Sequence, residues 1–352
     1  MKNIASKFCV DGEIVSIKSF GNGHINTTNL IQTTKTQYIL QYINKNVFTL
    51  PEKLMSNIQK VTSFLNEQQD NQLETLNFIN SVENKNFYKD DNGDYWRMYE
   101  FVKDSLCLEQ PESPDDFYEC GFGFGNFQKQ LNNFPAEQLF EIIPDFHNTP
   151  KRFETLLGAI KNDVCGRVKT VKEEIDFALL HKDFYNTLYD KANQGLLPTR
   201  VTHNDTKTNN VLLSETTRKA KCVIDLDTIM PGFSVNDFGD AIRAGANTAC
   251  EDETDLTKVS LDLELFEAFT KGFLNGCDGS LTEQEIMLLP VGAKMMTIEC
   301  GIRFLTDYLQ GDTYFKTNHP THNLDRCRTQ FALVRDMDKK WQQMNEIVKK
   351  YV

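Results

Sequence analysis

The balance of predicted strands and helices changes sharply about a third of the way along this 352-residue chain. The first hundred residues contain runs rich in β-branched and aromatic residues, and an Asn-Gly pair between two of these runs is a strong hairpin signal. An amphipathic pattern that begins at Pro51 predicts a single helix. In chain order we expect strands at 13–20, 27–34 and 37–43, the helix, a β-rich run at 76–82, and a hairpin of 86–89 with 95–102. This order predicts a small antiparallel sheet with one helix packed against it.

Helical patterns dominate the rest of the chain. Ser113-Pro114 followed by two acids predicts a helix start, and Thr282 with Glu285 matches a capping box. We expect helices near 114–132, 151–163, 168–194, 262–275 and 282–310, the last of them broken or kinked at Pro290. The exception is a segment at 195–240, which contains Gly, Pro and two short predicted strands at 209–213 and 221–226. Because loops on a rigid scaffold often carry catalytic residues, we expect the chemistry in this segment.

Composition narrows the class of ligand. The chain has 38 Lys and Arg against 50 Asp and Glu, and its net charge of −12 disfavours nucleic acid or an anionic membrane as a partner. No apolar run approaches the ~20 residues of a membrane-spanning helix, and the first ten residues lack the apolar core of a secretory signal. Nine scattered cysteines without a CxxC pair indicate reduced thiols in a cytoplasmic protein rather than a zinc site. No obligate protein partner is evident.

The segment at 195–240 contains HNDTKTNN and, after a short gap, VIDLD. In phosphoryl transfer a carboxylate must orient the attacking hydroxyl and accept its proton, and Asp205 is suited to this role. Magnesium prefers oxygen ligands, which Asn210 and Asp225 provide. Lys207 places a cation where a transferring phosphate would lie, whereas His203 is better suited to bracing the loop backbone.

Other acids nearby have structural as well as functional interpretations. Asp227 is either a second metal contact or a strand-end acid bonded to a backbone amide. Asp237 and Asp240 are expected to brace the loop or to pair with Arg243. A second H-x-D sequence at 181–183 lacks an asparagine five residues after its aspartate and lies in a helical pattern, so we interpret it as a helix surface.

The combination of HNDTKTNN with VIDLD resembles the aminoglycoside phosphotransferase/choline kinase branch of the protein-kinase-like superfamily, whose loop reads H-x-D-x-x-x-x-N. The resemblance implies an α+β, two-lobed protein-kinase-like fold. A small antiparallel sheet lobe would occupy 1–102, and a larger, mainly helical lobe would occupy 103–352. The resemblance also implies ATP and Mg²⁺ as cofactors, with Asp205 as the catalytic aspartate and Asn210 and Asp225 as metal ligands.

In such a fold the small lobe covers the nucleotide. The glycine-containing turn between the first two strands, with Gly21 and Gly23, would lie over the phosphates. The last strand would run into the hinge, where backbone groups of Glu100, Phe101 and Val102 would pair with adenine.

One departure from the kinase pattern concerns the third strand. Gln41 stands there where protein kinases have a phosphate-binding lysine, and its neutral amide supplies no charge. Either Lys207 and the metal ions compensate or catalysis is slow, and Glu52 is only a candidate for the helical glutamate that usually partners the lysine. The missing lysine also leaves open a nucleotide-binding pseudokinase that acts as a regulatory module.

Within the superfamily, three segments resemble the N-acetylhexosamine 1-kinase group: GNGHINTT (21–28), IPDFHNTPKRF (143–153) and a third at 302–330. The resemblance implies ATP-dependent phosphorylation of the anomeric hydroxyl of N-acetylglucosamine or N-acetylgalactosamine. The residues implied to contact the sugar are His24, Asp205, Asp225, Arg303 and Tyr314.

Alternatives to this acceptor stay open. Choline, homoserine, an aminoglycoside or another sugar are acceptors of the same superfamily. Arg303 also has a purely structural interpretation, because Asp307 stands four residues later and the two could form a solvated ion pair on one helix.

Overall fold

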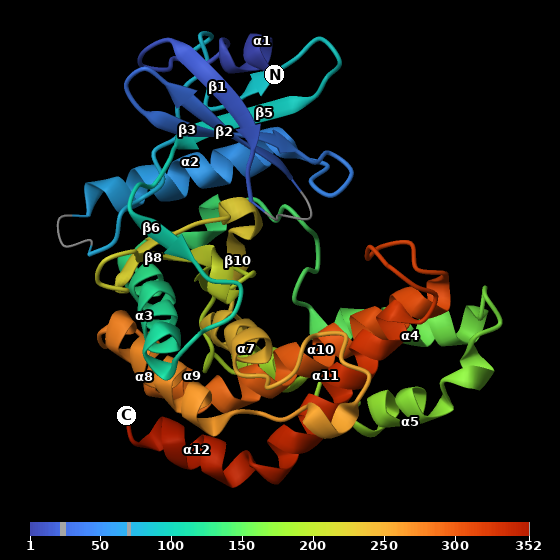
Figure 1. Ribbon diagram of the computed structural model, residues 1–352. Coiled ribbons are helices and arrows are strands. Elements are labelled where there is room, and N and C mark those ends of the chain that lie inside the picture. Colours follow the sequence, from blue (N-terminus) through green and yellow to red (C-terminus); the bar gives the residue numbers. More distant parts are fainter. Residues whose placement is uncertain (22–25, 69–71, 352) are drawn as a thin grey trace.

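The computed structural model describes residues 1–21, 26–68 and 72–351 and shows two lobes, one above the other in Figure 1. The small lobe contains a five-stranded, antiparallel sheet with the strand order β1-β2-β3-β5-β4. Its elements are α1 (Lys2–Ala5), β1 (Ile14–Ser19), β2 (Thr27–Thr33), β3 (Gln37–Ile43), α2 (Pro51–Glu67), β4 (Tyr88–Lys89) and β5 (Tyr95–Glu100). The predicted order of three strands, one helix and two strands is confirmed, and so is the α+β, two-lobed class.

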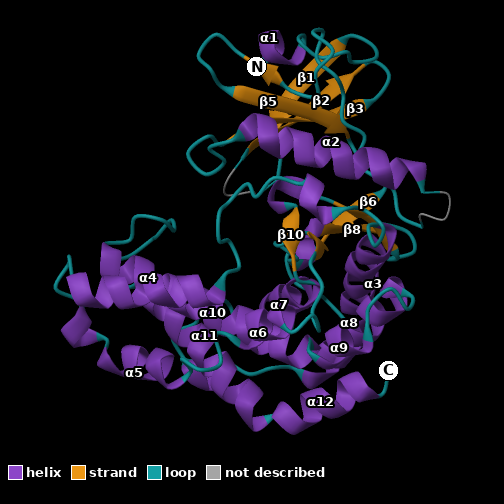
Figure 2. Cartoon of the chain, turned by 180° about the vertical axis from the view of Figure 1, so that it is seen from behind, coloured by secondary structure: helices purple, strands orange, loops and turns teal. Residues whose placement is uncertain are grey.

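Helix α2 lies across one face of this sheet (Figures 1 and 2). Pro51 occupies its first turn, where a missing N–H costs nothing, and Leu54, Ile58 and Val61 are buried as their spacing predicts. Asn57 on the same helix is 1% exposed and donates to the carbonyl oxygens of Phe140, at 2.8 Å, and Ile229, at 3.0 Å. This side chain therefore ties the small lobe to the large lobe.

The expectation of a strand at 76–82 is wrong. The amide of Ile79 donates to β5 at Met98, but the carbonyl oxygen of the next residue, Asn80, accepts from Cys9 near the N-terminus. Because the hydrogen bonds of this segment alternate between two partners, no continuous ladder forms, and only isolated bridges result.

The large lobe is mainly helical, and it forms the lower part of Figure 2. Its helices are α3 (Pro114–Gln130), α4 (Thr149–Asn162), α5 (Lys172–Leu180), α6 (Thr187–Asn193), α7 (Ser234–Gly245), α8 (Leu263–Cys277), α9 (Glu283–Met287), α10 (Leu289–Gln310), α11 (His322–Lys339) and α12 (Trp341–Lys349). The capping box of Thr282 and Glu285 is confirmed. The helical segment is interrupted at Leu288, between α9 and α10, and Pro290 lies in the first turn of α10. Helices α7, α11 and α12 were not anticipated from the sequence.

The single helix expected at 168–194 is wrong, because two helices and a turn replace it. Helix α5 ends at Leu180, and the hydroxyl of Tyr185 folds back to donate to the carbonyl oxygen of Ala178 at 2.9 Å. This hydrogen bond satisfies an acceptor that a continuing helix would have used. The second H-x-D sequence at 181–183 therefore lies in a turn and not on a helix surface.

The segment expected to carry the chemistry lies where the two lobes meet (Figure 1). Its strands are β7 (Arg200–Thr202), β8 (Val211–Ser214), β9 (Ala220–Val223) and β10 (Met230–Gly232), joined by β6 (Ser105–Cys107) from the start of the large lobe. They form a β6-β8-β9 sheet and a β10-β7 pair. Strand β9 ends before Asp225, which adopts a left-handed backbone conformation with φ 57°.

Glycines make the closest helix contact in the large lobe. The sequence GFGFGNF, whose phenylalanines predict helix packing, lies in α3, and Phe124 and Phe127 are indeed buried. The seam between α3 and α8, however, is formed by glycines on both helices. A Cβ atom added at Gly125 would lie 2.1 Å from the carbonyl oxygen of Phe273, and one added at Gly276 would lie 2.3 Å from that of Phe122.

We expect a Gly125→Ala substitution to destabilise the protein by about 1–3 kcal/mol, because the obstacle is backbone that no rotamer change can move. Gly158 in α4 is the matched control, since an added Cβ there meets nothing within 4 Å. Gly158→Ala should stabilise the protein by up to about 1 kcal/mol through helix propensity. Denaturant unfolding of both variants measures the difference, and equal effects would contradict the seam.

None of the helices in the described ranges is both long enough and apolar enough to cross a membrane. All nine cysteines of the chain are free thiols.

Candidate active site

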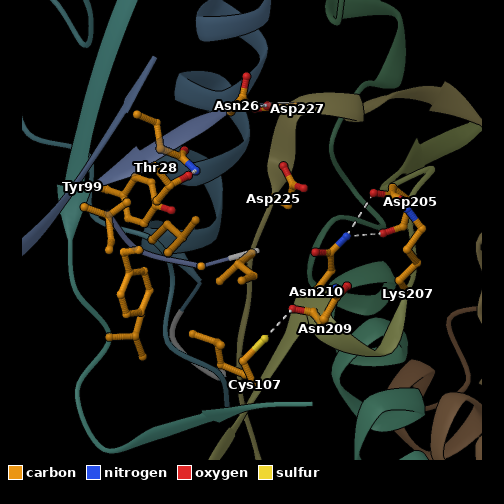
Figure 3. A pocket seen from close by; sticks show the side chains of 18 of the residues that line it. Asn26, Thr28, Tyr99, Cys107, Asp205, Lys207, Asn209, Asn210, Asp225 and Asp227 are labelled. Atoms are coloured by element: carbon orange, nitrogen blue, oxygen red, sulfur yellow. Dashed lines mark hydrogen bonds and ion pairs between the residues drawn. The ribbon is translucent and has the colours of Figure 1, made fainter. Parts of the chain in front are cut away.

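A cavity of about 520 Å³ lies between the two lobes, a volume in the usual range for small-molecule sites. It is lined by residues that directly follow β1, by residues of the hinge and by residues of the segment at 195–240. Of the predicted site residues, it is lined by Gly21, Gln41, Phe101, Val102, Asp205, Lys207, Asn210, Asp225 and Asp227. Figure 3 shows the small-lobe side chains on one side, Asp205 and Asn210 on the other, and Asp225 between them.

The loop that carries Asp205 is held from behind by buried polar contacts. Both carboxylate oxygens of Asp237 accept backbone N–H groups, from His203 and Asn204, at 2.8 Å each. His203 is fully buried, and its Nε2 donates to the carbonyl oxygen of Ile224 at 2.8 Å while its Nδ1 accepts from the amide of Asp205. His203 thus braces the backbone, as expected, and so does Asp237, whose carboxyl pKa is raised by burial.

Asp240, the second acid of α7, has both of its expected roles. It accepts the amide of Thr206 at 3.1 Å and pairs with the guanidinium of Arg243 at 2.8 Å. The expectation that these two acids are structural therefore agrees with their contacts.

Asp205 is oriented by two neighbours. The side-chain nitrogen of Asn210 donates to its carboxylate at 3.2 Å and to its backbone carbonyl oxygen at 2.8 Å. The ammonium group of Lys207 lies 2.9 Å from the other carboxylate oxygen, and this carboxylate is the main reason why the pKa of Lys207 is raised. The carboxylate is half-buried and opens on the cavity, so it is placed to receive a proton from a bound hydroxyl.

Asp225 is a carboxylate without a direct partner among the described residues. It opens onto the cavity, and no residue of the described chain gives it a hydrogen bond or an ion pair. The residue is exposed to the cavity, yet the protein around it withholds water from part of the carboxylate, and this desolvation, together with the like charges of Asp227 and Asp205, raises the pKa of its carboxyl to about 7. This arrangement favours a bound cation beside Asp225.

The donors near Asp225 fit magnesium. The side-chain nitrogen of Asn210 is occupied by Asp205, so its amide oxygen is left for a cation. Across the described ranges, no three His, Cys, Asp or Glu residues cluster as a metal site. A pair of oxygen ligands completed by phosphate and water is the usual way in which proteins hold Mg²⁺ at a nucleotide.

Asp227 faces the small lobe. One of its carboxylate oxygens pairs with Arg97 on β5, and the other accepts from the side chain of Asn26 at 2.6 Å. Neither residue was a candidate from the sequence. The signal that could have found Arg97 is its position opposite Gln41 in the pairing of β3 with β5, which was not predicted from the sequence.

The three predicted hinge residues differ in whether their backbone amides already have a hydrogen-bond partner. The amide of Glu100 donates to Asn77, and that of Phe101 donates to Gln37. The amide of Val102 has no partner within the described part of the chain, which makes it the free donor of the hinge. Two predicted site residues, Gly23 and His24, lie outside the described residues.

Arg303 and Tyr314 do not line this cavity. Arg303 lies on α10, and its guanidinium carbon is 5.2 Å from the ring centre of Phe146 and 5.7 Å from that of Phe315. The ring of Phe315 also contacts Tyr314, which is 62% exposed. Parts of the 143–153 and 302–330 segments thus meet in space.

The ion pair considered between Arg303 and Asp307 does not form among the described residues. The carboxylate of Asp307 instead accepts three consecutive backbone amides, from Thr313, Tyr314 and Phe315, at 2.8–2.9 Å. Among the described residues, Arg303 makes no hydrogen bond or ion pair.

A buried histidine links this aromatic cluster to the catalytic loop. The Nε2 atom of His147 lies 3.1 Å from the carbonyl oxygen of Asn204, the residue before Asp205. Its Nδ1 atom lies 2.8 Å from the buried carboxylate of Glu299, one helical turn before Arg303. The ring of His147 packs on Phe146 at 4.4 Å. Arg303 is therefore connected to the loop of Asp205 indirectly, through Phe146 and His147.

Solved structures of small-molecule kinases are similar to this chain over nearly its whole length. A microcompartment-associated aminopropanol kinase is 13% identical, with a TM-score of 0.65 and coverage of 98% of this chain and 97% of that chain. An aminoglycoside phosphotransferase from Alicyclobacillus acidocaldarius is 12% identical, with a TM-score of 0.65 and coverage of 99% and 96%. A choline kinase from Cryptosporidium parvum is 15% identical, with a TM-score of 0.60 and coverage of 93% and 90%. At these identities the likeness shows a shared fold.

The sequence itself matches a family profile. Residues 16–263, well over half of the chain, match the phosphotransferase enzyme family. The match spans both lobes and the whole of the cavity lining, including the loop with Asp205 and the strand end with Asp225. The chain therefore belongs to the phosphotransferase enzyme family.

Proposed function

We propose that the protein is an ATP-dependent kinase that phosphorylates the anomeric hydroxyl of an N-acetylhexosamine, either N-acetylglucosamine or N-acetylgalactosamine. Membership of the phosphotransferase family supports transfer of a phosphoryl group to an alcohol. The observation that carries the choice of a neutral acceptor is the unpaired guanidinium of Arg303, which lies over Phe146, the neighbour of the histidine that contacts the catalytic loop. The choice of hydroxyl rests on the resemblance of the three sequence segments to N-acetylhexosamine 1-kinases.

The nucleotide lies in the cavity between a lobe formed by residues 1–102 and a lobe formed by residues 103–352. The free amide of Val102 is the donor available to adenine. Gly21, with φ 74°, lines the cavity, and an added Cβ there would meet nothing within 4 Å. Gly21 therefore lies at the cavity without a neighbour that would exclude a phosphate from its side.

Transfer to the acceptor depends on the loop around Asp205. Asn210 fixes the orientation of the carboxylate, which aligns the acceptor hydroxyl and takes its proton. Lys207 is close enough to exchange part of its contact with Asp205 for the transferring phosphoryl group. Asn210 and Asp225 would hold Mg²⁺, which when bound neutralises charge on the phosphates.

Charges around Arg303 disfavour a protonated amine as acceptor. Arg152 is largely buried, and burial together with the charge of Arg303 lowers its pKa. The nearby carboxylates of Glu299 and Asp307 are already occupied, by His147 and by backbone amides. Asp145 is the carboxylate nearby with one oxygen not bonded to Asn148, so an ammonium group would have to compete with Arg152 for it. Hydroxyl and amide oxygens, in contrast, would accept from the guanidinium of Arg303.

The test of the proposal is a panel of acceptors with ADP release as the readout. We expect kcat/KM for N-acetylglucosamine or N-acetylgalactosamine to exceed that for choline, ethanolamine, aminopropanol and an aminoglycoside by at least about tenfold. NMR of the product should show phosphate on the anomeric carbon. Preference for a cationic amine would reject the sugar, and a 6-phosphate would reject the position.

The rival view of a pseudokinase is tested by the same panel. That view predicts nucleotide binding without turnover on any acceptor, because Gln41 supplies no charge. Turnover that depends on one acceptor excludes it.

Arg303→Gln should raise KM for the sugar by about 10- to 100-fold with a smaller change in kcat, because binding that is lost equally in ground and transition states appears in KM. Arg335 is the matched control, since its guanidinium also lies over an aromatic ring, 4.3 Å from the centre of Phe177, on α11. Arg335→Gln should leave the sugar kinetics unchanged. An Arg303→Gln variant with the sugar KM of the wild type would remove Arg303 from the acceptor site.

A further inference from the structure

The position of the missing lysine is not empty of charge, because its cross-strand partner is an arginine. Gln41 on β3 and Arg97 on β5 are directly paired across the two strands. The Nε atom of Arg97 donates to the side-chain oxygen of Gln41 at 2.8 Å, and the side-chain nitrogen of Gln41 donates to Thr28 on β2 at 3.0 Å. The neutral glutamine thus holds the guanidinium in place.

Arg97 is only 2% exposed, so it cannot act as a surface cation. Its compensating charge is Asp227, which is 3% exposed and lies in the other lobe. Burial alone would lower the pKa of Arg97, but Asp227 raises it overall, and the guanidinium stays charged. Breaking such a buried pair leaves one charge without a partner, which is strongly unfavourable.

The second carboxylate oxygen of Asp227 also accepts a hydrogen bond from the small lobe. Asn26, directly after the glycine-containing turn, donates to it at 2.6 Å, and the side-chain oxygen of Asn26 accepts the amide of Asn44 after β3. Figure 3 shows Asn26 beside Asp227, and Asp225 apart from both, between the two sides of the cavity that it lines. Both oxygens of Asp227 are therefore committed to the small lobe, and Asp225 is the carboxylate left free.

We propose that Arg97 is a positioning residue: by holding Asp227, together with Asn26, it fixes the turn that presents Asp225 and ties that turn to the small lobe, so that a cation on β5 orders the Mg-ATP site indirectly where β3 carries no lysine to bind phosphate. This inference rests on the proposed kinase function, because it assigns Arg97 a part in binding Mg-ATP. Arg97 touches no substrate, since it does not line the cavity, and it acts through Asp227.

A charge-relocation experiment tests the proposal. Arg97→Gln removes the cation, Arg97→Lys keeps it, and the double variant Arg97→Gln/Gln41→Lys moves it to the paired position on β3. We expect Arg97→Gln to lower kcat/KM for ATP on the order of 100-fold and the Mg²⁺-dependent part of ATP affinity, measured by calorimetry, by about tenfold or more. Arg97→Lys and the double variant should each recover most of both losses.

A merely structural role predicts a different pattern. Arg97→Gln would then melt at a lower temperature but, where folded, would bind Mg-ATP like the wild type, and relocation of the charge would rescue nothing. Either result overturns the proposal. Lys35→Gln is the control for charge removal in the same lobe, because Lys35 forms an exposed pair with Asp11 at 2.7 Å and should change neither readout.

Two further arms keep the result decisive. If Arg97→Gln does not fold, Asn26→Ala loosens the same carboxylate without leaving a buried charge, and it should lower Mg²⁺-dependent ATP affinity several-fold. Unchanged affinity in that variant would overturn the inference. If the wild type phosphorylates no hexosamine, the proposed acceptor fails, but calorimetry with Mg-ATP still decides the part of Arg97.

Discussion

An Asp205→Asn variant is expected to lose about 10²–10⁴-fold in kcat while its affinity for Mg-ATP stays within about twofold. The carboxamide has the size of the carboxylate, and its oxygen still accepts the hydrogen bond from Asn210, so the loop keeps its shape. What it loses is the capacity to take a proton from the acceptor hydroxyl. Steady-state ADP release measures kcat, and calorimetry measures nucleotide affinity.

The chain contains a matched control for this substitution. Asp183, in the second H-x-D sequence, is exposed and lies in the turn after α5, so Asp183→Asn should leave kcat unchanged. Near-normal turnover in Asp205→Asn would refute the assignment of the base. A parallel loss of ATP affinity would indicate instead that the carboxylate acts on the nucleotide side of the cavity.

Much of the fold could be predicted because the relevant signals are local. The spacing of Leu54, Ile58 and Val61 is enough to predict that α2 buries one face, and these side chains are indeed buried. The break between α5 and α6 could not be predicted in this way, because both pieces keep a helical pattern and the turn depends on Tyr185 packing back on Ala178. Such a contact is decided by tertiary structure.

Helix α7 was also missed, again because its formation depends on contacts with distant residues. Its buried acids, Asp237 and Asp240, resemble loop residues in the sequence, since buried carboxylates need partners that a helix does not itself provide. The partners are backbone amides of the catalytic loop more than 30 residues earlier. The bracing role of these two acids was expected from the sequence, but the helix that carries them was not.

In the active site, the residues found from the sequence are those whose spacing is short. Asp205 and Asn210 lie five residues apart on one loop, and their side chains do meet. Arg97 and Asn26 were missed because they stand 130 and 201 residues before their shared partner, Asp227. A lone arginine in an aromatic strand has the ordinary look of a surface residue, and only the register of β3 with β5 shows what it faces.

The second large effect is expected at Asp225, with opposite signs for stability and activity. Asp225→Asn should lower kcat/KM for Mg-ATP by about 10²–10⁴-fold, because a ligand for the cation on the phosphates is lost. Asparagine suits the left-handed backbone at this position, with φ 57°, so the turn can be kept. Initial rates across a range of Mg²⁺ concentrations measure the loss, which excess Mg²⁺ should repair only in part.

Without Mg-ATP the same variant should be the more stable protein. The pKa of Asp225 rises from its ordinary value of 3.8 to about 7 in the folded protein, because of desolvation and the like charges of Asp227 and Asp205. A raised carboxyl pKa means that the folded state binds the proton more tightly, so stability falls as pH rises from about 4 to about 7 and stays low above that. Because the side chain of Asp225 is exposed to the cavity, solvent screens much of this effect, so at pH 8 we expect Asp225→Asn to melt only slightly above the wild type, by about 1 °C or less, and the gap should close as the pH falls.

Mg-ATP should reverse this order, since a ligand stabilises the folded state only in proportion to its binding. The wild type should gain several degrees and Asp225→Asn little. Asp278, at the end of α8, is the control for a left-handed aspartate, with φ 44° and an exposed side chain paired with Lys129. Asp278→Asn should leave the Mg-ATP shift unchanged. If Asp225→Asn instead gained the full Mg-ATP shift, Asp225 would not be the ligand of the cation. The neighbouring carboxylate of Asp227 would then be the alternative ligand, and to bind the cation it would have to give up its ion pair with Arg97.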